Sequence, residues 1–340
     1  MAGRGRRTTA FYMLALLLFV AFAAAQAKGA DQRAFREVAR LGRGINILGY
    51  DGIWQGATNA PFRPENLIAI RNAGFSHVRI NFFGFKDMDS ENRLDPAVLG
   101  RLDMVIEEVL ASRLIPVLDE HDSDFCQRYV AKCAAKLKSF WRQIASRYAG
   151  KYPSLVFEIL NEPGGQMTSA GWNLLLNECL GIVRRSNPQR FVIAAALNTE
   201  VASIEKLALP ATDRNLIVTF HYYAPIEFTH QGAPWSRTFS KLGPIDWGTP
   251  KDKAKVIADF RTIKAWSDRE RRPIYLGEFG VYERAPSDSR RRYLSFLARN
   301  AERFGWAWAY WQFDHDFAAF DTEHQTWYKG VLDALIPGSH

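Results

Sequence analysis

The stretch VFEILNEPGG, residues 156–165, ends an apolar run on an amide and an acid. Its first half is typical of a buried strand. Proline and two glycines then end the strand and leave Glu162 at its rim. A second stretch, PIYLGEFG, residues 273–280, delivers Glu278 in the same way. Two acids at the ends of buried strands indicate a site where those strand ends meet.

Similar strand-like runs recur along the whole chain, and helical patterns with apolar residues at three- and four-residue intervals lie between them. Continuous apolar strands indicate a parallel sheet that is covered on both faces. Eight such units predict an α/β fold, a single-domain (β/α)8 TIM barrel over residues 42–336. The expected strands are GINIL (44–48), HVRIN (77–81), LIPVLD (114–119), LVFEIL (155–160), FVIAAAL (191–197), LIVTFH (216–221), PIYLGE (273–278) and GWAWAYWQF (305–313).

A doubly wound open sheet is the alternative fold. It would place a glycine-rich phosphate turn after the first strand, and NILGYDGIW at 46–54 lacks that pattern. The chain has no internal repeat, low-complexity tract or linker, which favours one domain. Its 340 residues, 47% hydrophobic and 13% aromatic, suffice for a large core.

The amino terminus carries a predicted secretory signal peptide, residues 1–27, with cleavage after Ala25 or Ala27. Arginines lead into an apolar run that small residues follow, and residues 28–41 form a lead-in to the barrel. We therefore expect a secreted or periplasmic protein without stable membrane contact after cleavage. An uncleaved membrane anchor is the alternative, but the run is shorter than the ~20 residues that a span needs.

The formal net charge is +8, but basic and acidic residues alternate along the chain. This pattern predicts a solvated surface and no nucleic-acid partner. Cys126 and Cys133 are close enough to bridge a surface loop, and whether they do is open. Cys179 lies in a helical pattern and is predicted to be a buried apolar filler. We expect a monomer.

Polar or aromatic groups occur at six of the eight expected strand ends, where barrel chemistry gathers. Ionisable groups are costly in apolar surroundings unless they are paired, so packing does not explain them. In chain order they are Arg79, His121, Asn161 with Glu162, His221 with Tyr222 and Tyr223, Glu278, and Trp308 with Trp311.

The two glutamates suit glycoside hydrolysis, which uses one carboxylic acid to protonate the leaving oxygen and a second carboxylate to attack or to activate water. Carboxyl groups ~5–5.5 Å apart retain the anomeric configuration, and groups ~6.5–9.5 Å apart invert it. The sequence leaves this distance open.

Six motifs in this order and spacing resemble glycoside hydrolase family 5, the cellulase family of clan A retaining glycosidases. They are RGINIL, HVRI, NEP, HYY, GEFG and WAYWQF, and the resemblance spans residues 42–336. It implies that Glu162 is the proton donor and later base, and that Glu278 is the nucleophile. Independently, a nearby Arg79 cation would favour the ionised form that a nucleophile needs.

The resemblance also implies supporting roles. Arg79 and Tyr223 would contact the nucleophile, and His221 would lie beside the catalytic pair. His121 and Asn161 would bind the sugar at the cleavage subsite, Asn161 through the 2-hydroxyl. The lead-in LDEHD to His121 departs from the family pattern, because it is more polar.

Two tryptophans are candidates for stacking on sugars. Trp308 and Trp311 differ by three positions along a strand and point to opposite faces, so Trp311, nearer the carboxyl end, is expected under the sugar. Trp235 lies in the long connection 222–250 and is a candidate sugar platform.

His121 with Asp119, Asp122 and Asp124 suggests a metal site as an alternative, but no second histidine is near in sequence. We therefore expect no metal and no cofactor. The most economical hypothesis is an endo-β-1,4-glucanase acting on a polysaccharide or oligosaccharide. β-Mannanase, β-1,3-glucanase and xyloglucanase stay open, because loops set specificity. A catalytically silent glycan-binding protein and a metal-dependent barrel hydrolase are the hypotheses of other classes.

Overall fold

The computed structural model describes residues 32–49, 51–56 and 60–338. The predicted signal peptide, 1–27 with cleavage after Ala25 or Ala27, and residues 28–31 of the lead-in lie outside the described residues. A helix over residues 32–41 precedes the first strand. No helix in the described part of the chain is long and apolar enough to cross a membrane.

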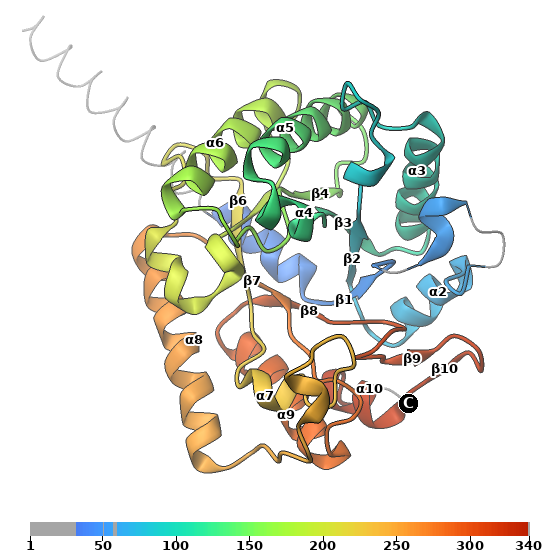
Figure 1. Cartoon of the computed structure of the whole chain (residues 1–340), viewed down its shortest axis with the longest axis vertical. Helices are drawn as coiled ribbons and strands as arrows, with labels where there is room; N and C mark the ends of the chain where they lie inside the picture. The colour runs from blue at the N-terminus through green and yellow to red at the C-terminus, as the bar shows by residue number, and fades with distance from the viewer. Residues whose placement is uncertain (1–31, 50, 57–59, 339–340) are drawn as a thin grey trace, which may run out of the picture.

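Eight parallel strands close into a barrel in chain order, because β1 pairs with both β2 and β8 (Figure 1). The predicted (β/α)8 barrel is thereby confirmed. Helices cover the outer face of the sheet and side chains fill the interior, which explains the continuous apolar strands. The strands are β1 (Arg43–Ile47), β2 (His77–Phe82), β3 (Ile115–Glu120), β4 (Val156–Glu158), β5 (Val192–Ala195), β6 (Leu216–His221), β7 (Ile274–Glu278) and β8 (Ala307–Tyr310).

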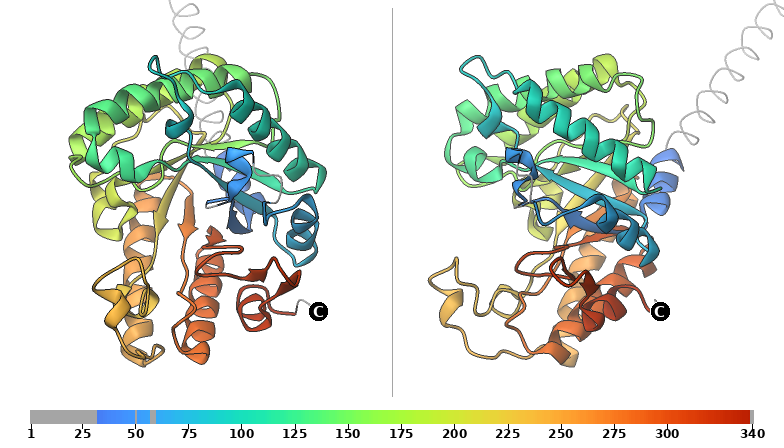
Figure 2. Two further views of the ribbon diagram at one scale, coloured as in Figure 1. Left: turned by 45° about the vertical axis from the view of Figure 1, so that its right-hand side comes forward. Right: turned by 90° about the vertical axis from the view of Figure 1, so that its right-hand side faces the viewer.

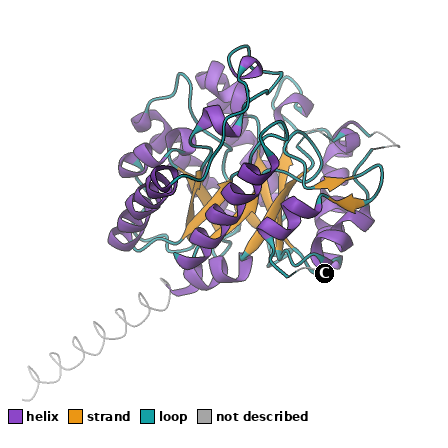
Figure 3. Cartoon of the chain, turned by 90° about the horizontal axis from the view of Figure 1, so that it is seen from below, coloured by secondary structure: helices purple, strands orange, loops and turns teal. Residues whose placement is uncertain are grey.

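Helices flank the central strands in Figure 3, which looks at the molecule from below relative to Figure 1. Asp95 caps α3 by accepting a hydrogen bond from the Ala97 amide, and Pro96 is the first residue of the helix. The helices are α2 (Pro64–Asn72), α3 (Pro96–Ala111), α4 (Ser123–Arg128), α5 (Val130–Arg147), α6 (Ser169–Ser186), α7 (Ile226–Thr229), α8 (Pro250–Glu270), α9 (Ser287–Arg303) and α10 (Lys329–Leu335). Short 3-10 helices are η1 (Gly52–Gln55), η2 (Phe85–Asp87), η3 (Leu197–Thr199), η4 (Val201–Lys206) and η5 (Phe239–Lys241), and β9 (Phe320–Asp321) and β10 (Thr326–Trp327) form a small hairpin.

Three of the strands are shorter than their apolar runs predict by three or more residues, and one of them is β5, which covers only Val192–Ala195 of the run 191–197. β4 ends at Glu158 rather than residue 160, because the chain must turn before Glu162, whose φ of 37° no strand permits. β8 ends at Tyr310 rather than residue 313. Trp311, the next residue, lies outside the sheet at the barrel mouth.

The barrel interior is apolar at its amino-terminal end and polar at its mouth. Inside the barrel, a small cluster of apolar side chains includes Val117, Val156, Ile193 and Ile217. The larger hydrophobic core lies between the strands and the helices. Figure 2 shows the strands running between the layer of α3 and α5 and that of α8 and α9. Because the interior changes from apolar to polar along the barrel axis, the ionisable groups lie at one end of the barrel.

A disulfide joins Cys126 of α4 to Cys133 of α5. Both cysteines are fully buried, so the bond lies inside the protein rather than in a surface loop. Cys179 is free and buried, as predicted.

Candidate active site

Arg79 lies at the centre of the barrel mouth and is fully buried. Its guanidinium donates to Glu158 Oε2 at 2.8 Å and to Glu278 Oε1 at 2.7 Å. The same group lies 3.0 Å from Asp119 Oδ2, so one cation binds three buried carboxylates.

Strand register explains why these groups meet. Asn46 of β1 is paired with Arg79 of β2, and Asp119 of β3 is paired with Glu158 of β4. Arg79 itself is paired with Val117 of β3, so the two acids lie one inward position nearer the strand ends, and the long Arg79 side chain reaches them. Arg79 also donates to Asn46 Oδ1 at 2.9 Å, which satisfies a further donor.

Burial is the largest influence on the ionisation of this cluster. It raises the pKa of Asp119 to about 7, against the opposing charge of Arg79. Burial likewise raises the pKa of Glu158, and Arg79 again opposes the shift. Part of the negative charge around Arg79 is therefore neutralised by protons near neutral pH.

Glu278 ends β7, is 5% exposed and is held at both oxygens. Oε1 accepts from Arg79, and Oε2 accepts from the Tyr223 hydroxyl at 3.0 Å. Burial raises the pKa of Tyr223 well above its ordinary value, so the phenol stays protonated and donates. The predicted contacts of Arg79 and Tyr223 with Glu278 are present in the structure.

Glu162 lies on the loop after β4, and its side chain is 37% exposed at the mouth. His221 Nδ1 lies 2.8 Å from Glu162 Oε1 and 3.5 Å from Glu278 Oε2. Burial lowers the pKa of His221 to about 4, so the ring is neutral at ordinary pH. Burial also raises the pKa of Glu162, and nearby His121 and Arg79 oppose the shift.

The two glutamates face each other. One carboxylate oxygen of each, together with a His221 ring nitrogen, lies within 4.8 Å of the others. This gap is closer to the separation of retaining than of inverting glycosidases, since inverting sites leave room for a water.

The same three residues are the group in the described chain with the geometry to hold a metal ion. A tetrahedral zinc site with bonds of about 2.0–2.2 Å needs ligand atoms roughly 3.5 Å apart. Metal binding would therefore require the set to rearrange, because His221 and Glu162 are only 2.8 Å apart, and it would occupy both carboxylates.

His121 and Trp311 form one wall of the site. Their rings stack with centroids 5.5 Å apart and planes 5° from parallel. His121 Nδ1 contacts the Asp119 carboxylate, and burial lowers the pKa of this histidine to about 4. Trp311 is 8% exposed at the mouth, whereas Trp308 is fully buried, so the two tryptophans separate as predicted.

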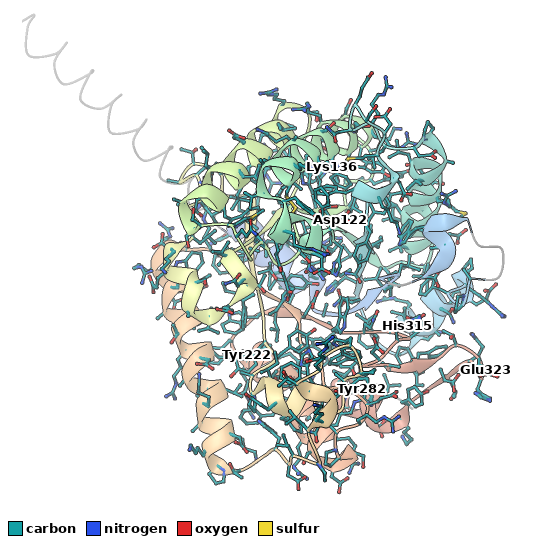
Figure 4. The ribbon with its side chains drawn as sticks, in the orientation of Figure 1. Asp122, Lys136, Tyr222, Tyr282, His315 and Glu323 are labelled. Carbon is teal, nitrogen blue, oxygen red and sulfur yellow. A yellow bond between two sulfur atoms is a disulfide. The ribbon has the colours of Figure 1, made fainter. Side chains whose placement is uncertain are left out.

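Asn161 and Trp235 complete the predicted residues. Asn161 Oδ1 accepts from Arg79 at 2.9 Å, so the arginine network fixes the orientation of the amide. Trp235 is 52% exposed, with its ring edge-on to Tyr282 at 4.9 Å. Tyr282 is marked near α7 in Figure 4. The Trp235 ring also lies 6.3 Å from that of Phe317, so Trp235 is on the exposed rim, beside the aromatic residues that flank the site.

A groove of about 930 Å³ opens beside Glu162. Tyr222 lies in its wall and donates to Asp259 of α8 at 2.7 Å (Figure 4). Its lining includes Gln127, Asn198, Glu200, His221 and Tyr223.

Sequence reasoning missed Glu158 and Asp119 as partners of Arg79, and Gln127 beside Glu162. For the two acids a signal exists, because each interrupts an apolar strand run. Gln127 lies on a short helix, and nothing in the local sequence distinguishes it.

A (β/α)8 barrel whose fourth and seventh strands deliver two glutamates to one cleft is the architecture of a barrel glycoside hydrolase. The Cellulase family, glycosyl hydrolase family 5, matches residues 40–316. The chain therefore belongs to glycosyl hydrolase family 5 and is a glycoside hydrolase.

Several relatives are similar over most of the chain. Endoglucanase H of Acetivibrio thermocellus is 29% identical over 321 residues, a match that covers 90% of this chain and 34% of that protein. This chain thus spans about a third of the length of Endoglucanase H. Endoglucanase C of the same organism is 25% identical over 334 residues, which covers 86% of this chain and 97% of that protein.

Endoglucanase Cel5A of Thermotoga maritima has a similar solved structure. It is 37% identical, with a TM-score of 0.84, and the match covers 89% of this chain and 99% of that chain. Cel5A structures have been solved with cellobiose and with mannotriose.

Proposed function

We propose that the protein is an endo-β-1,4-glucanase that cleaves with retention, with Glu162 as the acid/base and Glu278 as the nucleophile. The observation that carries the proposal is the gap between their carboxylates, whose oxygens lie within 4.8 Å of one another. That spacing leaves a sugar carbon, but no separate water, between the two groups.

In the first step Glu162 protonates the leaving oxygen while Glu278 attacks the anomeric carbon and forms a glycosyl-enzyme. Hydrogen bonds from Arg79 and Tyr223 hold the attacking carboxylate in place. Esterification removes the negative charge of Glu278. Glu162 can then more readily act as a base that activates water for the second step.

Four residues are proposed to bind the substrate, and a fifth, His221, is proposed to orient the acid/base. Trp311 stacks on the sugar at the cleavage subsite, and His121 and Asn161 hydrogen-bond to it. His221 orients Glu162 through its contact at 2.8 Å. Trp235, exposed on the rim, would be a more distant platform.

β-1,4-Glucan is the proposed substrate because several relatives are endoglucanases. β-Mannan is the second candidate, because Cel5A has been solved with mannotriose. A reducing-sugar assay on carboxymethylcellulose, barley glucan, mannan, xyloglucan and laminarin distinguishes them, with Glu278→Ala as the inactive control. Product from none of these would favour a glycan-binding protein, and loss of activity in EDTA would favour a metal-dependent hydrolase.

Retention is tested separately by proton NMR of the first product. The β-anomer must appear before mutarotation produces the α-anomer, whereas first appearance of the α-anomer would contradict the double displacement.

We also propose export and cleavage of residues 1–27, with residues 42–336 as a monomeric catalytic domain. Intact mass and amino-terminal sequencing of the exported protein would locate the cut. A mature chain that begins at residue 1 would instead support the membrane anchor.

A further inference from the structure

The loop that carries Glu162 has an unusual backbone. Glu162 has a φ of 37°, and Gly165 has a φ of 61°. A non-glycine residue in this region persists when its surroundings hold it there, and such positions cluster at active sites. The contacts of this loop are therefore part of how the carboxylate of Glu162 is aimed.

Gln127 of α4 contacts the loop at both ends. Its side-chain Nε2 donates to the Glu162 carbonyl at 3.1 Å, and its backbone carbonyl accepts from the Gln166 amide at 3.1 Å. A Cβ atom on Gly165 would lie 2.6 Å from Gln127 Cβ, so the close approach requires glycine. The Asn198 amide also donates to the Pro163 carbonyl of this loop at 2.5 Å.

Gln127 is itself held in place by its neighbour. Cys126 is bonded to Cys133 at the start of α5, which ties the short helix α4 to a long one. α5 is anchored on the segment between β4 and Glu162, since Trp141 Nε1 donates to the Ile159 carbonyl at 2.9 Å.

The junction between α4 and the barrel has a second anchor. Asp122 accepts from the Phe85 amide at 2.7 Å, and Lys136 of α5 donates to the Phe85 carbonyl at 2.9 Å. Both side chains are labelled beside α4 and α5 in Figure 4.

We infer that Gln127, fixed by the Cys126–Cys133 disulfide, is a positioning residue that holds the backbone of Glu162 in the conformation needed for proton transfer. This rests on the proposed function, in which Glu162 is the acid/base. Gln127 acts on the reaction through Glu162. Its loss should therefore impair protonation of the leaving group rather than attack by Glu278.

Leaving-group dependence tests this. Cellotetraose needs protonation of its leaving oxygen, whereas 2,4-dinitrophenyl β-cellobioside needs little, and kcat/KM reports this first step for both. Gln127→Met keeps the side-chain length and removes the donor. We expect kcat/KM on cellotetraose to fall about three- to tenfold, as for loss of one hydrogen bond, with less than about twofold change on the dinitrophenyl substrate.

The paired variant Cys126→Ala/Cys133→Ala should show the same selective loss. Arg128→Gln, the next residue on α4, is the matched control and should change neither value. Gln127→Glu provides a second side-chain test, since its carboxylate would repel the Glu162 carbonyl and should produce at least the loss seen with methionine. Melting curves of each variant serve as the control that the protein is folded under assay conditions.

The variant Glu162→Gln distinguishes failure of the positioning role of Gln127 from failure of the proposed acid role of Glu162. If it loses cellotetraose activity selectively but both Gln127 variants lose both activities equally, or neither, the positioning role is overturned and the proposed function stands. Equal loss on both substrates in Glu162→Gln overturns the acid assignment and the inference with it.

Discussion

The buried side chain of Arg79 holds the carboxylates around it in place, and one of them is Glu278. Three carboxylates bind its guanidinium, and two of them, Asp119 and Glu158, are completely buried. Burial of one cation with three acids is tolerated because hydrogen bonds and protonation offset the desolvation. The arrangement ties the position of Glu278 to the integrity of the interior.

Replacing Arg79 by methionine should therefore damage both stability and catalysis. The variant leaves buried carboxylates without their cation, and removing one partner of such a group costs about 3–5 kcal/mol. Urea unfolding near pH 7 measures that loss. Arg43→Met is the control, because Arg43 pairs with Glu302 at a partly exposed site where a loss below about 1 kcal/mol is expected. Equal effects of the two substitutions would contradict the assigned role of Arg79.

The pH dependence of catalysis should report Glu162. A raised pKa keeps the acid protonated to higher pH than an ordinary glutamic acid, and activity is lost as pH rises through that pKa. The alkaline limb of kcat/KM on cellotetraose should therefore lie above the usual pKa of the group. The dinitrophenyl substrate needs little protonation, so its alkaline limb should be displaced upward or absent. Coincident limbs for the two substrates would argue against Glu162 as the acid.

Among the strands and helices, the carboxyl ends of the strands were the features from which the site could be predicted. Glu162 and Glu278 stand out because each ends an apolar run and proline or glycine follows. Glu158 also interrupts an apolar run, but its pairing with Arg79 could not be predicted, because the two residues are distant in the chain and only the folded barrel brings them together. Where β4 and β8 end was also hidden, since their apolar patterns continue past the point where the backbone turns.

The connection between β6 and α8 presents Trp235 to solvent, and this exposure makes a substitution there informative. Trp235→Ala should raise KM for long cello-oligosaccharides about fivefold, as expected for losing roughly 1 kcal/mol of stacking. kcat/KM for the short dinitrophenyl cellobioside should change little, because the platform lies on the exposed rim. Trp235→Phe should recover most of the affinity. Unchanged KM for every chain length would remove Trp235 from the substrate site.

The barrel as a whole has a floor at the end opposite the active site, and a buried histidine crosses this floor. His77 of β2 is fully buried, with Nδ1 2.8 Å from the Leu41 carbonyl and Nε2 2.9 Å from the Tyr275 hydroxyl. It thus joins the helix 32–41 to β7 across the barrel floor. Its partner on β1 is Gly44, where a Cβ atom would lie 2.1 Å from the ring, so glycine is required there.

The neutral ring suits these partners, since Nδ1–H donates to the carbonyl and Nε2 accepts from the phenol. Burial lowers the pKa of His77 to about 4, a shift that the nearby Arg79 reinforces. Between pH 6.5 and 4 the unfolded chain therefore binds a proton that the folded chain excludes. The stability that His77 contributes is full above the unfolded pKa and is lost as pH falls toward 4.

His77→Gln lacks this titration and tests the effect against the wild-type protein. The difference in unfolding free energy between the two proteins should be largest near pH 7 and should shrink by about 3 kcal/mol as pH approaches 4. Urea denaturation at pH 7, 6, 5 and 4.5 measures the difference, and other titrating groups cancel because both proteins carry them. A difference that stays constant across this range would mean that His77 accepts its proton inside the folded barrel, and the floor would then have to rearrange around a cation.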